Sequence, residues 1–133
     1  MKLREQEFHI AVETMLCSII DARRCWWCHI PNEGVRSQAA LAILCRMGLK
    51  PGAPDYVIVV EVPGEWARAF FIELKFDDGV LSDNQIRCHT ALNRIGGKVY
   101  ICRSIDEVLR ALTIERVPTR IVGGIEAVQR KIA

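Results

Sequence analysis

Apolar and polar residues form two different patterns along the chain, one with the period of an α-helix and one of continuous apolar runs. In residues 3–22, apolar side chains recur every three or four positions, which is the spacing of one face of an α-helix. The same spacing predicts three further helices: 36–47, Ser82 to about Ile95, and Ser104 or Asp106 to about Leu112. Continuous apolar runs, typical of strands buried on both faces, predict three strands: 55–62, 67–76 and Lys98–Cys102.

The order of these elements predicts the fold class. Between the first two helices, Trp26–Ile30 is a short strand or an extended segment. We therefore expect an α/β fold in which helices flank a mixed central β-sheet. A chain of 133 residues is long enough for one core, so 1–133 is interpreted as a single domain. The pattern in the tail, 113–133, is compatible with a strand near Val117–Val122 and a short helix from Ile125.

Composition narrows the class of protein only slightly. The chain is 50% hydrophobic and 26% charged, as ordinary globular proteins are. Its formal net charge of +2 neither demonstrates nor excludes a polyanionic partner. No apolar run approaches the roughly 18 residues that a membrane span needs. The first residues form no apolar signal segment, so we expect a cytoplasmic protein whose six cysteines are free thiols.

Two charged residues interrupt an apolar strand. Glu73 and Lys75 share one face of this strand with Phe71, because side chains alternate along a strand. Burial of charge is costly unless it is compensated, and a cation bound at an open strand end would compensate it. Asp55 stands at the start of the preceding strand. If the two strands are antiparallel neighbours, Asp55 and Glu73 converge, and their oxygens suit Mg²⁺ or Mn²⁺. The alternative is a structural ion pair.

Helical phase adds further candidates. At about 100° per residue, Glu5 falls near the centre of the apolar stripe of the first helix, whereas Glu7 falls opposite it. Glu5 is therefore a candidate for the acidic cluster, although the helix dipole alone also favours an acid in the first turn. Ser82 and Gln85 have the spacing of a capping box. Capping is compatible with an additional role for Gln85 in the site.

The motif Cys25-x-x-Cys28-His29 has two metal-related readings. It matches the covalent haem attachment pattern, but haem attachment requires export, and we therefore expect no haem. A structural zinc site would need a fourth ligand from another cysteine. The interpretation that we favour is buried or partly buried thiols beside the packing side chains of Trp26 and Trp27.

Six segments, which run in order over roughly residues 5–110 and so span most of the chain, share a pattern with one known family. They are Glu5-x-x-Phe8, Trp27-x-His29-Ile30-Pro31-Asn32-x-Gly34-x-Arg36-Ser37, Gly48-Leu49-Lys50-Pro51-Gly52-Ala53-Pro54-Asp55, Phe71-Ile72-Glu73-Leu74-Lys75, Gly79-x-Leu81-Ser82-x-x-Gln85 and Val99-Tyr100-Ile101-Cys102-Arg103-Ser104. The chain resembles the stand-alone VRR-NUC domains of the PD-(D/E)XK nuclease superfamily. The combination of the segments is specific, whereas each alone is weak.

The resemblance implies a restriction-endonuclease-like core, related to Holliday junction resolvases, and metal-dependent hydrolysis of phosphodiester bonds in DNA. Asp55, Glu73 and the backbone carbonyl of Leu74 would bind Mg²⁺ or Mn²⁺, with Glu5 as a further candidate ligand. The metal would polarise the phosphate and lower the pKa of its water.

The resemblance also assigns roles around the metal. Lys75 would orient or activate the attacking water, or stabilise charge on the phosphorane, and Gln85 would support the site. Four residues on flanking loops are candidates for contacts with DNA phosphates: Asn32, Arg36, Ser37 and Lys50. Each of the four is also explained as solvated surface.

Small stand-alone members of this family look like phage or prophage proteins and tend to be homodimers. We therefore expect a role in DNA replication, repair or recombination, on branched or junction DNA, in a bacterial cell or a phage-infected host. Apolar residues of the tail are candidates for a dimer interface: Ile114, Val117, Ile121, Val122, Ile125 and Val128. Two alternatives remain, namely a non-catalytic nucleic-acid-binding module on the same fold and a metal-binding protein based on cysteine.

Overall fold

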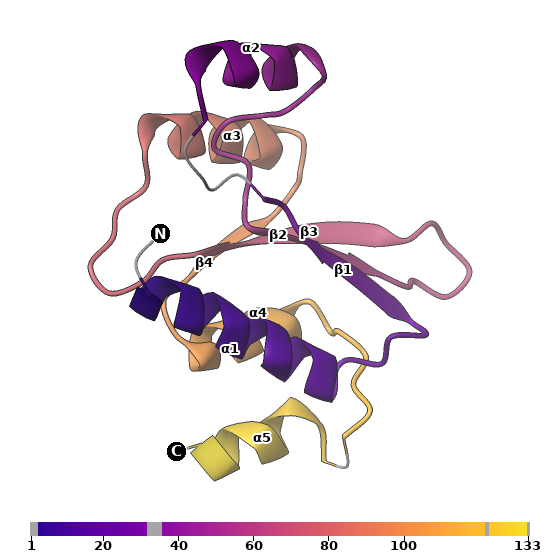
Figure 1. Ribbon diagram of the computed structural model, residues 1–133. Coiled ribbons are helices and arrows are strands. Elements are labelled where there is room, and N and C mark those ends of the chain that lie inside the picture. Colours follow the sequence, from indigo (N-terminus) through magenta and orange to yellow (C-terminus); the bar gives the residue numbers. More distant parts are fainter. Residues whose placement is uncertain (1–2, 32–35, 122, 133) are drawn as a thin grey trace.

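A four-stranded mixed sheet forms the centre of the molecule (Figure 1). The computed structural model describes residues 3–31, 36–121 and 123–132. In sheet order the strands are β1 (Cys25–His29), β2 (Tyr56–Val60), β3 (Arg68–Leu74) and β4 (Val99–Cys102). β1, β2 and β3 are antiparallel neighbours, and β4 is parallel to β3. The predicted α/β fold with a mixed sheet is confirmed.

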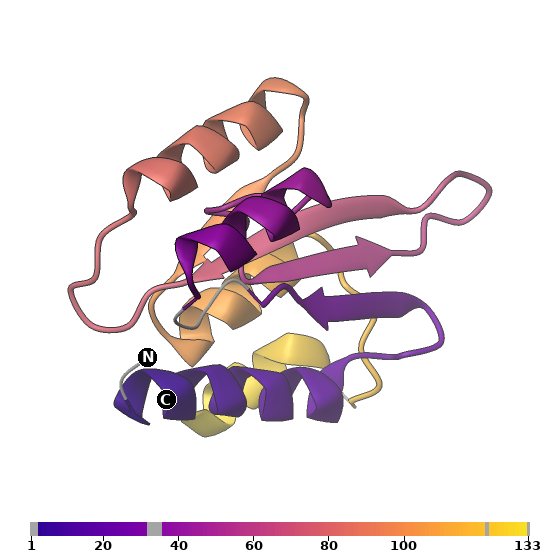
Figure 2. The same ribbon diagram turned by 45° about the horizontal axis from the view of Figure 1, so that its top comes forward.

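Helices cover both faces of the sheet (Figures 1 and 2). On one side lie α1 (Leu3–Ile19), α4 (Ile105–Ile114) and α5 (Gly124–Ile132). On the other side lie α2 (Gln38–Arg46) and α3 (Asp83–Arg94). None of the described helices is long and apolar enough to cross a membrane.

The core lies between the sheet and the α1–α4 layer. The apolar stripe predicted for the first helix supplies Val12 and Leu16, which are fully buried. They belong to the same buried cluster as Phe70 and Ile72 of β3 and Leu109 of α4. Burial of one such large apolar side chain contributes about 1.5–3 kcal/mol, so this layer fixes α1 against the sheet.

Serine side chains begin three of the helices. Ser37, Ser82 and Ser104 are the N-caps of α2, α3 and α4, and each hydroxyl accepts a hydrogen bond from a backbone N–H of the first turn. At α3 the capping box predicted from Ser82 and Gln85 is complete, with both reciprocal hydrogen bonds present. Capping therefore fixes the N-terminus of α3, from which Gln85 projects.

The tail differs from the expected strand near Val117–Val122. In its described part the pairing is reduced to one bridge, between Ile20 and Thr119. Arg120 instead donates its backbone N–H to the carbonyl of Ile19, and its guanidinium donates to the carbonyls of Cys17 and Ser18. These bonds satisfy carbonyls at the C-terminal end of α1, which explains why the segment closes a helix rather than extending the sheet.

In Figure 1, α2 lies beyond α3 on the side of the sheet opposite α1. It forms where the periodicity predicts, and Gly48, with φ of 107°, follows its C-cap. None of its residues is buried. The apolar side chains of Leu41, Ile43 and Met47 remain 37%, 56% and 78% exposed.

Candidate active site

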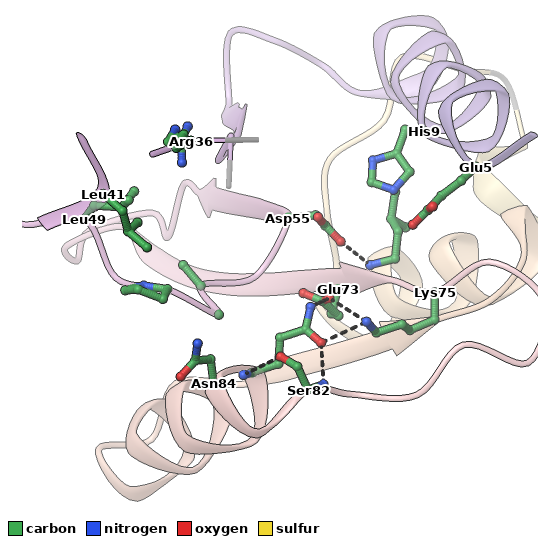
Figure 3. Close-up of a pocket in the computed structure, with 15 residues that line it drawn as sticks. Glu5, His9, Arg36, Leu41, Leu49, Asp55, Glu73, Lys75, Ser82 and Asn84 are labelled. Atoms are coloured by element: carbon green, nitrogen blue, oxygen red, sulfur yellow. Dashed lines mark hydrogen bonds and ion pairs between the residues drawn. The ribbon is translucent and has the colours of Figure 1, made fainter. Parts of the chain in front are cut away.

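A cavity of about 390 Å³ opens beside the end of β3. Five of its lining residues are the catalytic candidates of the sequence analysis: Glu5, Asp55, Glu73, Lys75 and Gln85. They come from α1, the segment before β2, β3 with the residue that follows it, and α3. In Figure 3, Asp55, Glu73 and Lys75 point toward a common space that α1 borders with Glu5 and His9.

Strand pairing brings the two carboxylates together. β2 and β3 are antiparallel, and Tyr56 pairs with Ile72, so Asp55 reaches the level of Glu73. Oδ2 of Asp55 accepts a hydrogen bond of 2.7 Å from the backbone N–H of Leu74. The antiparallel arrangement expected from the sequence is therefore present, and it positions Asp55 on the backbone of β3.

Gln85 links the carboxylate to the lysine. Its Oε1 accepts hydrogen bonds from Nζ of Lys75, at 2.8 Å, and from the backbone N–H of Ser82, at 2.9 Å. Its Nε2 donates to Oε1 of Glu73 at 2.5 Å. Because a side-chain amide has one donating and one accepting end, it satisfies a lysine and a carboxylate at once. A second carboxylate at position 85 would instead repel Glu73.

Glu73 is held in an environment that disfavours its charge. Its side chain is 2% exposed. Burial, and then the negative charge of Asp55, raise the pKa of Glu73 from 4.5 to about 7, while Lys75, 3.6 Å away, acts in the opposite direction. Any added positive charge in the cavity would therefore favour the ionised form of Glu73.

One oxygen of Glu73 lacks a hydrogen-bond partner. Oε2 is buried and faces Nε2 of His89 at 3.8 Å, and neither atom makes a hydrogen bond. Burial, and then the charge of Lys75, lower the pKa of His89, so at neutral pH the imidazole carries no charge to balance Glu73. Buried carboxylate oxygens normally have partners.

Two other carboxylates in the chain show the usual arrangement. Both oxygens of Glu13 accept hydrogen bonds from Trp27, and Oε2 also accepts one from Tyr56. Both oxygens of Glu115 likewise accept hydrogen bonds, from Arg68 and from Tyr100. In contrast to Glu13 and Glu115, Glu73 has an oxygen without a hydrogen-bond partner, and Asp55 is a second carboxylate nearby. This arrangement fits a site that binds a hard divalent cation.

The phase of α1 agrees with the expectation for its acidic residues. Glu5 lines the cavity and is partly buried, whereas Glu7 is exposed and is not among the lining residues. His9, one helical turn after Glu5, lines the cavity as well. A carboxylate and an imidazole thus enter the site from the same face of α1.

The four candidates for DNA contact differ in their exposure and hydrogen bonding. Arg36 is exposed and lines the cavity. Lys50 is exposed on the loop before β2. The hydroxyl of Ser37 accepts a hydrogen bond of 3.1 Å from the backbone of Ala40, which occupies it as a helix cap. Asn32 lies outside the described residues.

The cysteine motif does not assemble into one site. Cys25 is buried and Cys28 is exposed, because residues three apart on β1 point to opposite faces of the sheet. Trp27 is partly buried and Trp26 is 60% exposed. A metal site that uses both cysteines is incompatible with this strand, so the cysteine-based alternative is wrong. The expectation of packing tryptophans holds for Trp27 and is wrong for Trp26.

Comparison with known proteins decides the family. Residues 11–106 match the VRR-NUC domain, which is well over half of the chain. The chain belongs to the VRR-NUC domain family. This is a family of nuclease-like domains, and the match includes Asp55, Glu73, Lys75 and Gln85. It begins after Glu5, so the first turns of α1 are placed in the site by the structure alone.

A solved structure, a "VRR_NUC domain protein", shares the fold of this VRR-NUC chain. The TM-score is 0.60 at 20% sequence identity, and the likeness covers 89% of this chain and 93% of the other. No curated protein sequence matches the chain. The likeness in structure supports the α/β fold class and the complete sheet.

Three histidines near the site were not among the candidates predicted from the sequence: His9, His29 and His89. His89 follows Gln85 by four residues, and His9 follows Glu5 by four, so each shares a helix face with a candidate residue. That spacing was the available signal. His29 belongs to the cysteine motif and to a family segment, neither of which assigns it to the site, and its place beside Asp55 depends on the pairing of β1 with β2.

Proposed function

We propose that this VRR-NUC protein is a DNA endonuclease that depends on Mg²⁺ or Mn²⁺ and cuts branched or junction DNA during phage or bacterial replication, repair or recombination. The observation that carries the proposal is a single connected group. Asp55, Glu73, Lys75 and Gln85 line one cavity, and hydrogen bonds join Gln85 to both Glu73 and Lys75. Family membership supports nuclease activity, and the buried carboxylate of Glu73, with one oxygen that lacks a hydrogen-bond partner, supports the cation.

Asp55, Glu73 and the carbonyl of Leu74 would bind the cation, with Glu5 close enough to the same cavity to contribute. When bound, the cation polarises the phosphate and lowers the pKa of a coordinated water. The backbone of Leu74 holds Asp55 through its hydrogen bond to Oδ2, so this carboxylate is oriented before substrate arrives.

Lys75 would act on the reacting phosphate or on the attacking water. Its side chain is 15% exposed, and Gln85 holds Nζ at the wall of the cavity. A positioned ammonium group can orient water, or stabilise the negative charge that grows on the phosphate oxygens in the transition state. Arg36 and Lys50 would attract the DNA backbone from exposed positions.

The test is cleavage of labelled flaps, splayed arms, four-way junctions and plain duplex, with Mg²⁺, with Mn²⁺ and with chelator. We expect cleavage of branched substrates only with a divalent cation. Lys75→Ala should lower the rate by roughly 100-fold or more while DNA affinity stays near that of the parent, since the lysine acts on the transition state.

The matched control is Lys131→Ala, at an exposed lysine of α5 outside the cavity, which should leave cleavage unchanged. Full activity in chelator would contradict metal dependence. Binding of branched DNA without cleavage under any cation would instead identify a non-catalytic binding module. Equal cleavage of plain duplex would remove the proposed preference for branches.

A further inference from the structure

A second group of metal-ligating side chains lies beside the proposed catalytic carboxylates. One ligand atom from each of His9, His29 and Asp55 lies within 4.8 Å of the other two. The three residues come from α1, from the end of β1 and from the segment before β2. The function proposed above uses Asp55 but neither histidine, so the two imidazoles need a separate account.

The fold builds this group from two independent constraints. The pairing of β1 with β2 places His29 opposite Tyr56, next to Asp55, and the backbone N–H of Ile30 donates to the carbonyl of Asp55 at 2.6 Å. His9 arrives from α1, whose position is fixed by the buried side chains of Val12 and Leu16.

The rings are held edge to face rather than stacked. The centroids of His9 and His29 are 6.0 Å apart with an interplanar angle of 85°. His29 also meets the buried ring of Tyr56 at 5.5 Å and 62°. Contact with the rigid core restricts the imidazole of His29, and preorganised ligands lose less conformational entropy when they bind an ion.

The donor set selects a class of metal. Two imidazole nitrogens and one carboxylate oxygen suit Zn²⁺ and Co²⁺, whereas Mg²⁺ prefers oxygen ligands alone. Three protein ligands leave a coordination position for water or for an oxygen of a bound molecule. His9 and Asp55 both line the cavity of about 390 Å³, so that position would open toward the candidate active site.

We propose that His9, His29 and Asp55 form a second metal site, which takes a borderline transition-metal ion such as Zn²⁺ or Co²⁺. It shares Asp55 with the site for Mg²⁺ or Mn²⁺. The role of Asp55 as a ligand in both sites rests on the proposed nuclease function, whereas binding of the transition metal by the three residues does not. The bridging carboxylate makes the two sites separable by mutation: Asp55→Asn weakens both, Glu73→Gln weakens only the Mg²⁺ site, and the histidine variants weaken only the second.

The test is titration of the whole chain with Co²⁺ in excess Mg²⁺, followed by visible absorption and by equilibrium dialysis. We expect one Co²⁺ per chain that excess Mg²⁺ does not displace. His9→Ala and His29→Ala should each weaken Co²⁺ binding by roughly tenfold or more, and Glu73→Gln should retain it. Circular dichroism checks that each variant is folded.

Thiols are the competing ligands for Co²⁺. Cys17, Cys28 and Cys45 are exposed, so the matched control is Cys28→Ser, adjacent to His29, which should bind Co²⁺ as the parent does. The site would be overturned if Co²⁺ still bound to both histidine variants, or if Cys28→Ser abolished binding. It would also be overturned if the spectrum showed thiolate-to-cobalt charge transfer, or if excess Mg²⁺ displaced the Co²⁺. If Co²⁺ binds as expected and no DNA is cut, the nuclease proposal fails and this one stands. If DNA is cut with Mg²⁺ and the histidine variants bind Co²⁺ normally, the nuclease proposal stands and the second metal site is refuted.

Discussion

At the scale of single residues, Glu73 is a group of the site whose pKa is strongly affected by its surroundings. It is buried, lies beside a second carboxylate, and its pKa is raised from 4.5 to about 7. The folded protein therefore binds a proton at Glu73 more tightly than the unfolded chain does. The resulting stability is fully present below about pH 4.5 and is lost as the pH rises through about 7.

Replacement of Glu73 by Gln should remove this pH dependence. In chelator, the unfolding free energy of the parent should fall between about pH 5 and about pH 8 relative to that of Glu73→Gln, by on the order of 3 kcal/mol. Urea unfolding across this range measures the difference. Added Mg²⁺ should raise the parent's melting temperature more at about pH 8, where Glu73 is ionised. Parallel curves for the two proteins would contradict the burial of an ionisable Glu73.

Glu5 and Glu7 provide a matched pair on one helix. Glu5 lines the cavity and Glu7 is exposed outside it. Glu5→Gln should therefore lower the initial rate of DNA cleavage more than Glu7→Gln, because the change removes charge only where the substrate and the cation would bind. Initial rates at saturating DNA measure both. Equal effects, or a larger effect at Glu7, would contradict the assignment of Glu5 to the site.

At the scale of elements, the loop before β2 supports the N-terminus of α3. Gly52 has φ of 85°, and a Cβ at this position would lie 2.3 Å from the backbone carbonyl atoms of Asn84 and 2.5 Å from the nitrogen of Gln85. Only glycine permits this approach, because it lacks a Cβ and adopts positive φ freely. The loop that leads to Asp55 is thus pressed against the turn that carries Gln85.

Gly52→Ala should therefore destabilise the protein by more than about 1 kcal/mol and lower cleavage through displacement of Gln85. The matched control is Gly96→Ala, at φ of 87° with nothing within 4 Å of the added Cβ. It imposes similar backbone strain without the clash. Thermal unfolding and cleavage rates of both variants separate the two effects. The same loss of activity in both would mean that backbone strain, rather than contact with α3, is responsible.

At the scale of the whole molecule, we propose that the active form is a homodimer. Each chain would offer one proposed acidic site, and two such sites related by two-fold symmetry would match a branched DNA of the same symmetry. Of the tail residues proposed for the interface, Val117 and Ile125 are buried within the chain, and Ile114 is 60% exposed. Val122 lies outside the described residues. Among the described members of that set, Ile114 is the apolar side chain that we expect to meet a second copy.

Light scattering at micromolar concentration should give about twice the chain mass of 15.0 kDa. Ile114→Lys should shift the protein toward monomer, because it places a charge in an apolar contact. The control is Ile10→Lys, at a side chain of α1 that is 65% exposed. A monomeric parent that cuts both strands of a junction in one binding event would contradict the dimer. Equal shifts in both variants would remove α4 and the tail from the interface.

Much of the fold could be predicted because its signals are local. Hydrophobic periodicity depends on near neighbours in the sequence, so it located α1, α3, β2, β3 and β4 to within a few residues. Ser82 and Ser104 marked helix starts for the same reason. The strand expected in the tail was wrong, because the backbone of this segment forms hydrogen bonds with residues at the C-terminal end of α1. These bonds join residues about a hundred positions apart, so no local pattern predicts them.

What the sequence alone determined is therefore most of the elements, the faces on which Glu5, Glu73 and Lys75 stand, and the family to which its motifs point. The pairing of Asp55 with Glu73 followed from those faces once β2 and β3 were neighbours. Only the tertiary structure decided which faces meet. It placed His89 behind Glu73, brought His9 and His29 to Asp55, and left the apolar side of α2 exposed. Such contacts join residues far apart in the chain, and they depend on the packing of every intervening element.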